Sequence, residues 1–263
     1  MIITSKDNES IKNIRKLKDK KYRDLSNEYI VEGIKMIQEA INEKATIKTI
    51  VVCDDCKNSG MIPKEVLYEI AKYECIYVSE KIFNLITDVS NPQGILAVIE
   101  KNNVKASINY DEDLVVILDN IQDPGNLGTI LRTADSIGLK QVIVSKESVD
   151  CFNPKVVRST MGAIFRVKVI ERESLTKTVN DLKKHDFKVY ATSLEESKSI
   201  YEVDYTKSAI IIGNEANGVS KELLEITDTN IRIPMLGKTE SLNASVATAI
   251  VLYEAMRNKL IGK

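Results

Sequence analysis

The chain has 263 residues, of which 43% are hydrophobic and 29% are charged, and its formal net charge at pH 7 is -1. A chain of this length can form one large domain or two medium ones with ample cores. The balanced charge argues against a wholly basic nucleic-acid binder but allows local basic patches. The first ten residues lack the apolar core of a signal peptide, and no apolar run could span a membrane, so we expect a cytoplasmic protein.

The cysteines and the single histidine limit the chemistry that the chain can perform. Cys53 and Cys56 form one C-x-x-C pair, but the sequence lacks the second pair that a zinc site of this type requires. We therefore expect free buried thiols, a reducing compartment and no metal. With His185 as the only histidine, mechanisms that rest on a Ser-His or Cys-His pair are largely excluded.

Residues 10–25 have apolar side chains at helical spacing with a run of basic side chains between them. The basic residues are Lys12, Arg15, Lys16, Lys18, Lys20, Lys21 and Arg23. Between Lys12 and Arg23, Asp19 is the only acidic residue. Two interpretations fit this pattern equally well: a solvated helix face, which is the usual role of a charge run, and a surface that binds RNA phosphates.

The rest of the first hundred residues predicts a small α/β domain. An amphipathic helix is expected to begin near Ile34, after residues 28–33. Further strands are expected at 47–53, 76–78 and 95–99, with helices near 63–73 and 80–87. Residues 1–100 thus have an ordinary size for a domain. Residues 101–113 are polar and lack periodicity, so we interpret them as a linker.

Residues 114–263 alternate regularly between strand and helix patterns. Strands are expected at 114–118, 141–145, 165–170, 188–192, 209–213 and 231–234. Helices are expected at 127–137, 154–161, 176–184, 221–226 and 243–260. This alternation predicts an α/β fold with a parallel sheet and helices on both faces. The last helix has apolar or small residues nearly all round, which indicates burial within the fold or against a second subunit.

Three polar segments of this second half follow predicted strands. Residues 123–134 read Asp-Pro-Gly-Asn-Leu-Gly-Thr-Ile-Leu-Arg-Thr-Ala, where a turn, a helix start and an arginine favour an anion site, although Arg132 could equally form a surface ion pair. Residues 212–218 read Ile-Gly-Asn-Glu-Ala-Asn-Gly, at the strand end where open α/β sheets bind ligands. Alone, this segment also fits an ordinary strand–turn–helix joint.

The third segment reads Ile-Pro-Met at 233–235 and Glu-Ser-Leu-Asn-Ala-Ser-Val-Ala at 240–247. Together and in this order, the three segments resemble the motifs of the SpoU (TrmH) branch of the SPOUT family of RNA ribose methyltransferases. Glu32-Gly33 and Asn-Pro-Gln-Gly at 91–94 are similar to the N-terminal substrate-binding domain of many members. The resemblance implies a deep trefoil knot, S-adenosylmethionine as cofactor, RNA as substrate and a homodimer through the last helix.

The resemblance also assigns roles to individual residues. It places four residues at catalytic positions: Asn126, Arg132, Glu215 and Asn243. It places four others around the cofactor: Thr192, Gly213, Ile233 and Leu242. Arginine is often described as the base in this family, yet deprotonating a guanidinium at pH 7 costs roughly 9 kcal/mol. We therefore expect Arg132 to hold a phosphate and stabilise the developing alkoxide, with deprotonation as the alternative.

These observations predict an S-adenosylmethionine-dependent enzyme that methylates a ribose 2′-hydroxyl of RNA. Residues 1–100 would choose the RNA and residues 114–263 would bind the cofactor. We prefer 23S ribosomal RNA as substrate, because the N-terminal domain is similar to the accessory module of members that modify ribosomal RNA. The alternatives are a tRNA ribose methyltransferase and a catalytically silent RNA-binding protein of the same fold. A nucleotide-dependent oxidoreductase would require a glycine fingerprint that the sequence lacks.

Overall fold

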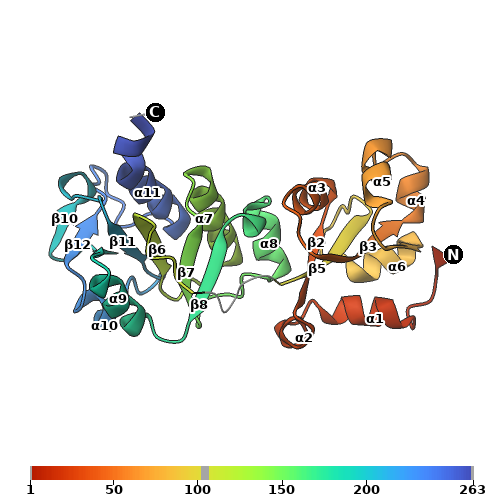
Figure 1. Cartoon of the computed structure of the whole chain (residues 1–263), viewed down its shortest axis with the longest axis horizontal. Helices are drawn as coiled ribbons and strands as arrows, with labels where there is room; N and C mark the ends of the chain where they lie inside the picture. The colour runs from red at the N-terminus through yellow and green to blue at the C-terminus, as the bar shows by residue number, and fades with distance from the viewer. Residues whose placement is uncertain (1, 102–106, 262–263) are drawn as a thin grey trace. The chain divides into compact units, whose positions relative to one another are not determined.

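The computed structural model describes residues 2–101 and 107–261 of the chain (Figure 1). Residues 102–106 of the expected linker therefore lie outside the described residues. The chain forms two compact units. The first comprises Met1–Asn102 together with Asp150–Phe165, and the second comprises Asn103–Val149 together with Arg166–Lys263. Each unit has its own sheet, and we describe the two in turn.

The first unit contains a mixed five-stranded sheet in the order β1-β4-β3-β5-β2. Its strands are β1 (Ile2–Ile3), β2 (Glu28–Glu32), β3 (Ile47–Cys53), β4 (Cys75–Val78) and β5 (Ile95–Glu100). Strand β5 runs antiparallel to β2 and β3, whereas β1, β3 and β4 are parallel. The sequence analysis did not predict β2. Its central residues Tyr29, Ile30 and Val31 are aromatic or β-branched, and such residues favour an extended strand. All three are buried in the sheet.

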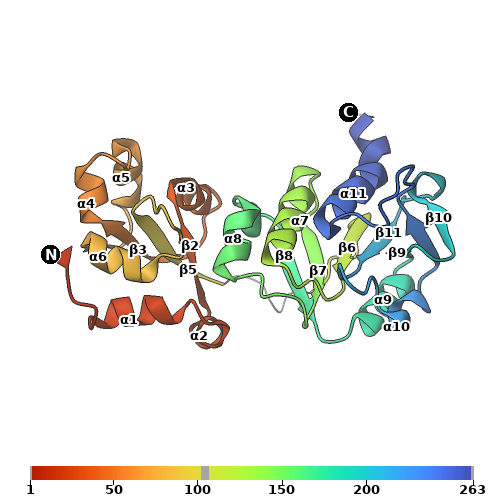
Figure 2. The same ribbon diagram turned by 180° about the vertical axis from the view of Figure 1, so that it is seen from behind.

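Helices cover both faces of this sheet. They are α1 (Glu9–Lys16), α2 (Lys20–Ser26), α3 (Ile34–Asn42), α4 (Asp54–Asn58), α5 (Lys64–Ile70), α6 (Glu80–Ile86) and α8 (Pro154–Thr160), with a 3-10 turn at Ala163–Phe165. Figures 1 and 2 show α1 and α6 on one side of the sheet, and α3 and α5 on the other. Helix α1 begins where Asn8 accepts hydrogen bonds from the backbone of Ser10 and Ile11, and it buries Ile11 and Ile14.

The segment Asp150–Phe165 belongs by sequence to the second half of the chain but packs within the first unit. Helix α8 lies against β2. The ring of Phe152 contacts the ring of Tyr29, with centroids 4.7 Å apart. The sequence analysis predicted this helix at 154–161 but assigned it to the domain at 114–263, because local periodicity does not reveal what an apolar face packs against.

The second unit contains a seven-stranded, wholly parallel sheet in the order β10-β12-β9-β11-β6-β7-β8. Its strands are β6 (Leu114–Leu118), β7 (Gln141–Ser145), β8 (Lys168–Arg172), β9 (Lys188–Thr192), β10 (Ser197–Ser199), β11 (Ser208–Ile212) and β12 (Thr229–Arg232). The predicted α/β fold with a parallel sheet is confirmed. Strand β8 begins three residues later than expected, because residues 163–165 form the 3-10 turn. The sequence analysis did not predict the short β10.

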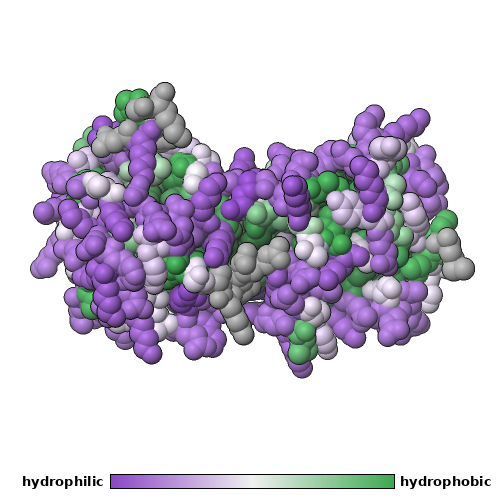
Figure 3. Space-filling model, in the orientation of Figure 1, coloured by the Kyte–Doolittle hydropathy of each residue, from purple (hydrophilic) through white to green (hydrophobic). Residues whose placement is uncertain are grey.

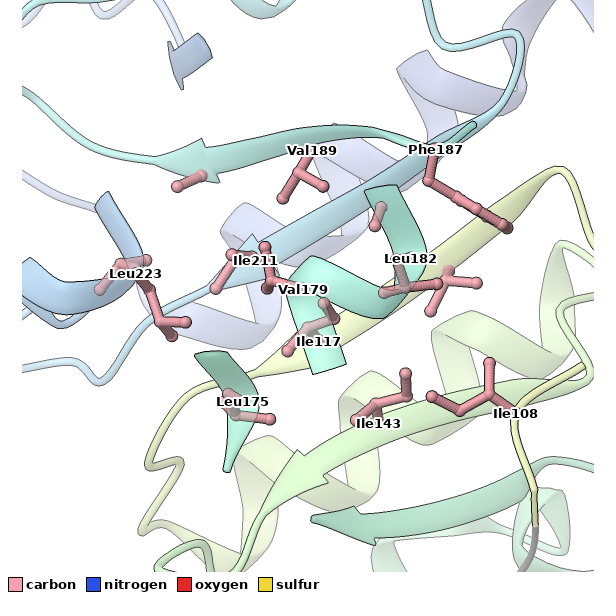
Figure 4. Close-up of a cluster of buried hydrophobic side chains, with 14 of the residues drawn as sticks. Ile108, Ile117, Ile143, Leu175, Val179, Leu182, Phe187, Val189, Ile211 and Leu223 are labelled. Atoms are coloured by element: carbon pink, nitrogen blue, oxygen red, sulfur yellow. The ribbon is translucent and has the colours of Figure 1, made fainter. Parts of the chain in front are cut away.

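Helices also cover both faces of the second sheet. They are α7 (Pro124–Ser136), α9 (Leu175–Lys184), α10 (Lys221–Leu224) and α11 (Ala244–Ile261), with a 3-10 turn at Ile200–Glu202. Leu175, Val179 and Leu182 of α9 point at Ile117, Ile143 and Ile211 of the strands (Figure 4). Helices α7 and α11 pack against each other on the opposite face (Figure 1).

No helix in the described part of the chain is long and apolar enough to cross a membrane. Hydrophilic side chains cover most of the face that Figure 3 shows on each unit.

Candidate active site

Three loops of the second unit leave the carboxyl ends of neighbouring strands. They follow β6, β11 and β12, and each carries one of the three predicted motifs. Strand β11 pairs with β6 and β9, and β12 pairs with β9, so the loops begin at the same edge of the parallel sheet. This is the edge at which open α/β sheets bind ligands.

The structure joins one residue from each motif in a single hydrogen-bonded chain. The Nδ2 of Asn243 donates to Oδ1 of Asn126, at 3.0 Å. The Nδ2 of Asn126 donates in turn to Oε1 of Glu215. Three of the four predicted catalytic residues therefore meet, although they lie far apart in the sequence.

The surroundings of the two asparagines set the direction of this chain. The Oδ1 of Asn243 accepts hydrogen bonds from the backbone N–H of Ser245 at 3.0 Å and from its Oγ at 2.7 Å, so it caps the start of α11. Only its NH₂ group is then left to face Asn126. Asn126 is itself buried, and its backbone N–H donates to Oδ1 of Asp123 at 2.8 Å. The start of α11 thus holds the donor that faces Asn126, and the start of α7 holds the donor that faces the Glu215 carboxylate.

Helix α7 begins at Pro124, three residues before its expected start, because Asp123 caps it. The same helix carries Arg132, six residues after Asn126, which corresponds to about 9 Å along the helix axis. The Arg132 side chain is exposed and makes no hydrogen bond or ion pair with any residue in 2–101 or 107–261. The described residues therefore give no support to the interpretation of Arg132 as an ordinary surface ion pair. Its five donors are available to an anionic ligand.

The predicted cofactor residues lie at the same edge of the sheet. Thr192 ends β9, and its Oγ1 donates to the carbonyl of Ile211 in the neighbouring β11 at 3.2 Å. Gly213 follows β11, where a Cβ atom would come within 2.1 Å of the backbone of Gly218. Only glycine permits this close approach of the two ends of the loop. Ile233 follows β12, and Leu242 directly precedes Asn243.

The predicted RNA-binding residues of the first unit divide into two groups. Five of them are exposed: Lys12, Arg15, Lys16, Lys20 and Lys21. Lys16 and Lys21 flank the ring of Tyr22, with Nζ at 5.7 and 6.0 Å from its centroid. Lys18 is half-buried and pairs with Asp88 at 2.8 Å.

The prediction that Arg23 belongs to this exposed surface is wrong. Arg23 is buried, and its Nε and Nη2 donate to Oδ2 of Asp150 at 2.9 and 2.6 Å. Its Nη1 donates to the carbonyls of Leu17 and Lys18, both at 2.8 Å. The charge pattern could not reveal this, because the partner carboxylate lies 127 residues away in the sequence.

The sequence analysis also missed a group of polar residues behind the motif loops. Asp119 and Asn120 follow β6 directly. The carboxylate of Asp119 and the backbone carbonyl of Asn120 accept hydrogen bonds from the loop after β11. The signal that could have found them is their position, since polar residues directly after a buried parallel strand lie at the ligand-binding edge.

Among the described residues, no cluster of histidine, cysteine, aspartate or glutamate side chains could hold a metal ion. The four cysteines are free thiols. Burial raises the pKa of the Cys75 thiol, and burial together with a hydrogen bond to Cys53 raises the pKa of Cys56 to about 12.

Comparisons with known proteins agree with this geometry. The model of the SpoU rRNA Methylase family matches residues 113–253, and the model of the MRM3-like substrate binding domain matches residues 8–97. The chain belongs to the SpoU methylase family. The SpoU relative 23S rRNA (guanosine(2553)-2′-O)-methyltransferase RlmP of Bacillus subtilis is 37% identical over 252 residues, which cover 95% of this chain and 97% of RlmP.

Two solved SpoU structures resemble the whole chain. The AdoMet-bound rRNA methyltransferase of Sinorhizobium meliloti has a TM-score of 0.83 and 31% identity, and covers 98% of each chain. The SpoU methyltransferase AviRb of Streptomyces viridochromogenes, in complex with AdoMet, has a TM-score of 0.84 and 25% identity, and covers 97% of this chain and 100% of AviRb. The predicted family, enzyme class and cofactor are confirmed: this SpoU protein is an RNA ribose 2′-O-methyltransferase that uses S-adenosylmethionine.

The residues at the carboxyl edge fit this cofactor. S-adenosylmethionine combines an apolar adenine ring with polar ribose and amino-acid groups. The loops after β9 and β12 present Leu194 and Leu242 with exposed fractions of 64% and 37%, and Leu236 fully exposed. Exposed apolar side chains beside the backbone groups of strand ends suit a ligand of this mixed character.

Proposed function

We propose that this enzyme methylates one ribose 2′-hydroxyl of 23S ribosomal RNA. The observation that carries the proposal is the hydrogen-bonded chain from Asn243 through Asn126 to Glu215. Helix α7, which carries Asn126, also carries Arg132, whose side chain has no partner among the described residues. The similarity to RlmP over nearly the full length of both chains, including the N-terminal unit, supports ribosomal RNA rather than tRNA as the substrate.

Bound S-adenosylmethionine supplies an electrophilic methyl group. Arg132 binds a phosphate next to the target ribose and stabilises the negative charge that develops on the 2′-oxygen. The proton of the 2′-hydroxyl then passes to solvent. In the alternative, Arg132 is neutral before the step and takes this proton itself. Asn126 has one N–H bonded to Glu215 and its Oδ1 bonded to Asn243, so its second N–H remains to orient the ribose. Glu215 and Asn243 hold Asn126 in this orientation.

Thr192, Gly213, Ile233 and Leu242 would hold the cofactor, mainly through backbone groups at the strand ends. The close packing of Gly213 against the backbone of Gly218 and Val219 supports this assignment. A side chain at position 213 would push the two ends of the loop apart and would move the backbone groups that would bind the cofactor. Exposed leucines on the adjacent loops would contact the adenine ring.

We also assign a deep trefoil knot and a homodimer to the second unit, in a cytoplasmic protein. The packing of α11 on α7, together with the bond between Asn243 and Asn126, supports threading of the C-terminal segment beside the first motif. Helix α11 leaves Val246, Tyr253 and Ile261 exposed by 47%, 49% and 73%, which favours a second copy of the chain as its cover. Sedimentation as a monomer at micromolar concentration would contradict the dimer.

The first unit would select the RNA. The surface formed by Lys12, Arg15, Lys16, Lys20 and Lys21 supports this role, because exposed ammonium and guanidinium groups bind phosphates.

Methyl transfer in vitro tests the proposal. The full chain is incubated with S-adenosylmethionine labelled on its methyl group and with unmodified 23S rRNA, 16S rRNA or tRNA, and nucleosides are then analysed. We expect a single 2′-O-methylated nucleoside from 23S rRNA. A product from tRNA would support the tRNA enzyme instead, and cofactor binding with no product from any RNA would support a silent RNA-binding protein.

A further inference from the structure

Both ends of the loop that carries Glu215 are bonded to the turn that follows β6. The backbone N–H of Asp119 donates to the carbonyl of Ile212 at 2.9 Å, at the start of the loop. The Oδ2 of Asp119 accepts the backbone N–H of Ser220 at 2.8 Å, at its end. One aspartate therefore closes the loop at both of its ends.

Asn214 connects the same turn to the residue next to it, Glu215. Its Nδ2 donates to the carbonyl of Asn120 at 2.8 Å. Its Oδ1 accepts the backbone N–H of Ala216 at 2.8 Å and of Asn217 at 3.3 Å, so it also shapes the turn that presents Glu215. The two ends of this side chain thus tie the Glu215 turn to the turn after β6.

The turn after β6 is supported from behind by two serines. Asn120 has a φ of 57°, in the left-handed region that asparagine tolerates. Its N–H donates to Oγ of Ser145 at 2.9 Å, and the N–H of Ile121 donates to Oγ of Ser148 at 3.1 Å. The two hydroxyls lie 3.0 Å apart, and both serines are buried. A turn held in this way offers a rigid support for the loop after β11.

We propose that Asn214 and Asp119 are positioning residues for methyl transfer, which place the Glu215 carboxylate where it receives the N–H of Asn126. This inference rests on the proposed function, since it assumes that Glu215 acts in the reaction. Neither residue contacts the substrate in this account. They affect the reaction by fixing the position of Glu215, which in turn fixes the position of Asn126.

Asn214→Asp tests the proposal in the full-length protein. Aspartate keeps the oxygen that accepts from Ala216 but loses the donor to Asn120 and faces that carbonyl with a second oxygen. We expect the single-turnover rate of methyl transfer to fall about 10- to 100-fold, as small displacements of catalytic groups do. The dissociation constant for S-adenosylmethionine should change much less. The matched control is Asn180→Asp, which makes the same change of charge at an exposed side chain of α9, outside the motif loops, and should keep its activity.

A double-mutant cycle with Glu215→Ala separates positioning from a general loss of structure. If Asn214 acts through Glu215, Asn214→Asp should cause no further loss of rate in the Glu215→Ala background. Equal losses in both backgrounds, or full activity of Asn214→Asp, would overturn the inference. Full activity of Glu215→Ala alone would instead contradict the proposed function, so the two failures are distinguishable.

Asp119 gives an independent check by conservative rescue. Asp119→Asn keeps an oxygen that can accept the N–H of Ser220, whereas Asp119→Ala removes it. We expect Asp119→Asn to retain most of the single-turnover rate and Asp119→Ala to lose it, again without further loss in the Glu215→Ala background. Equal activity of the two variants would contradict a positioning role for Asp119.

Discussion

Arg23 on α2 and Arg132 on α7 carry the same guanidinium group in opposite surroundings. The Arg23 side chain is only 3% exposed, and it donates to Asp150 and to two backbone carbonyls. Arg132 is exposed and has no partner among the described residues. An arginine whose three nitrogens all donate inside the protein stabilises the fold, whereas one that has no protein partner on a helix beside a polar sheet edge can bind a ligand.

This difference gives each arginine its own measurable signature. Replacement of Arg23 should change stability and leave the chemical step intact, whereas replacement of Arg132 should do the reverse.

Replacing Arg23 with methionine should lower the free energy of unfolding by about 3–5 kcal/mol, because it leaves the Asp150 carboxylate, whose side chain is only 11% exposed, without its cation. Urea unfolding measures this loss. Lys20→Met on the same helix is the control and should change stability by no more than about 0.5 kcal/mol, since Lys20 is exposed. A loss below about 1 kcal/mol for Arg23→Met would contradict a structural role for this ion pair.

Arg132→Ala should slow methyl transfer by about two to three orders of magnitude, which corresponds to about 3–4 kcal/mol of transition-state stabilisation. Its unfolding curve and its affinity for S-adenosylmethionine should remain those of the unchanged protein. Single-turnover kinetics measure the rate. Arg132→Lys separates the two roles: activity that rises steeply with pH would support deprotonation, and inactivity at every pH would support a bidentate phosphate contact.

The exposed lysines of the first unit should contribute to RNA binding through salt-dependent contacts. Replacing Lys16, Lys20 and Lys21 with alanine should reduce the slope of log affinity against log salt by about one for each RNA phosphate that the variant no longer binds. RNA binding at several salt concentrations measures this slope. The control replaces Lys44, Lys64 and Lys72, which are exposed elsewhere in the same unit. Equal changes of slope in both triple variants would show that the α1–α2 surface has no special role.

The smallest effect concerns Glu32, whose pKa is raised by burial, against the opposing hydrogen bond from Thr87. A carboxyl with a raised folded-state pKa binds its proton more tightly in the folded protein, so its ionisation costs stability as pH rises through that pKa. Relative to the unchanged protein, Glu32→Gln should therefore be more favourable at pH 7 than at pH 4. Thermal unfolding across this range checks the sign, and a difference that is constant with pH would contradict it.

Much of the second unit could be predicted because its strands are short, continuous apolar runs. The strands at Leu114–Leu118, Gln141–Ser145 and Lys188–Thr192 have the predicted bounds. The three motifs also indicated which residues would meet, and Asn126, Glu215 and Asn243 do meet. For the strands, the information lies in a local apolar pattern. For the three site residues, it came from the resemblance of the motifs to those of the SpoU family.

What could not be predicted depends on distant partners. The pairing of Arg23 with Asp150 and the position of Asp150–Phe165 in the first unit join segments more than a hundred residues apart. The bonds from Asp119 and Asn120 to the loop after β11 are of the same kind. No local periodicity reports such contacts, because they depend on which face of one element covers another.

The place of Asp150–Phe165 also affects how the roles of the two halves are tested. A fragment that begins near residue 111 would keep Phe152 and Asp150 but lose Tyr29 and Arg23, which cover them. Exposed apolar surface and an unpaired carboxylate would then disturb the fragment for reasons unrelated to RNA. Point variants in the full chain avoid this difficulty.

We propose that the site formed by Asn126, Arg132, Glu215 and Asn243 methylates ribose in 23S ribosomal RNA. Mapping of ribose methylation across all cellular RNA tests it most directly, in a strain that lacks the protein and in the same strain supplied with the unchanged protein or with Arg132→Ala. We predict that one 2′-O-methylated nucleotide of 23S rRNA disappears in the deletion strain, returns with the unchanged protein and stays absent with Arg132→Ala. An unchanged methylation map in the deletion strain, or restoration by Arg132→Ala, would contradict the claim.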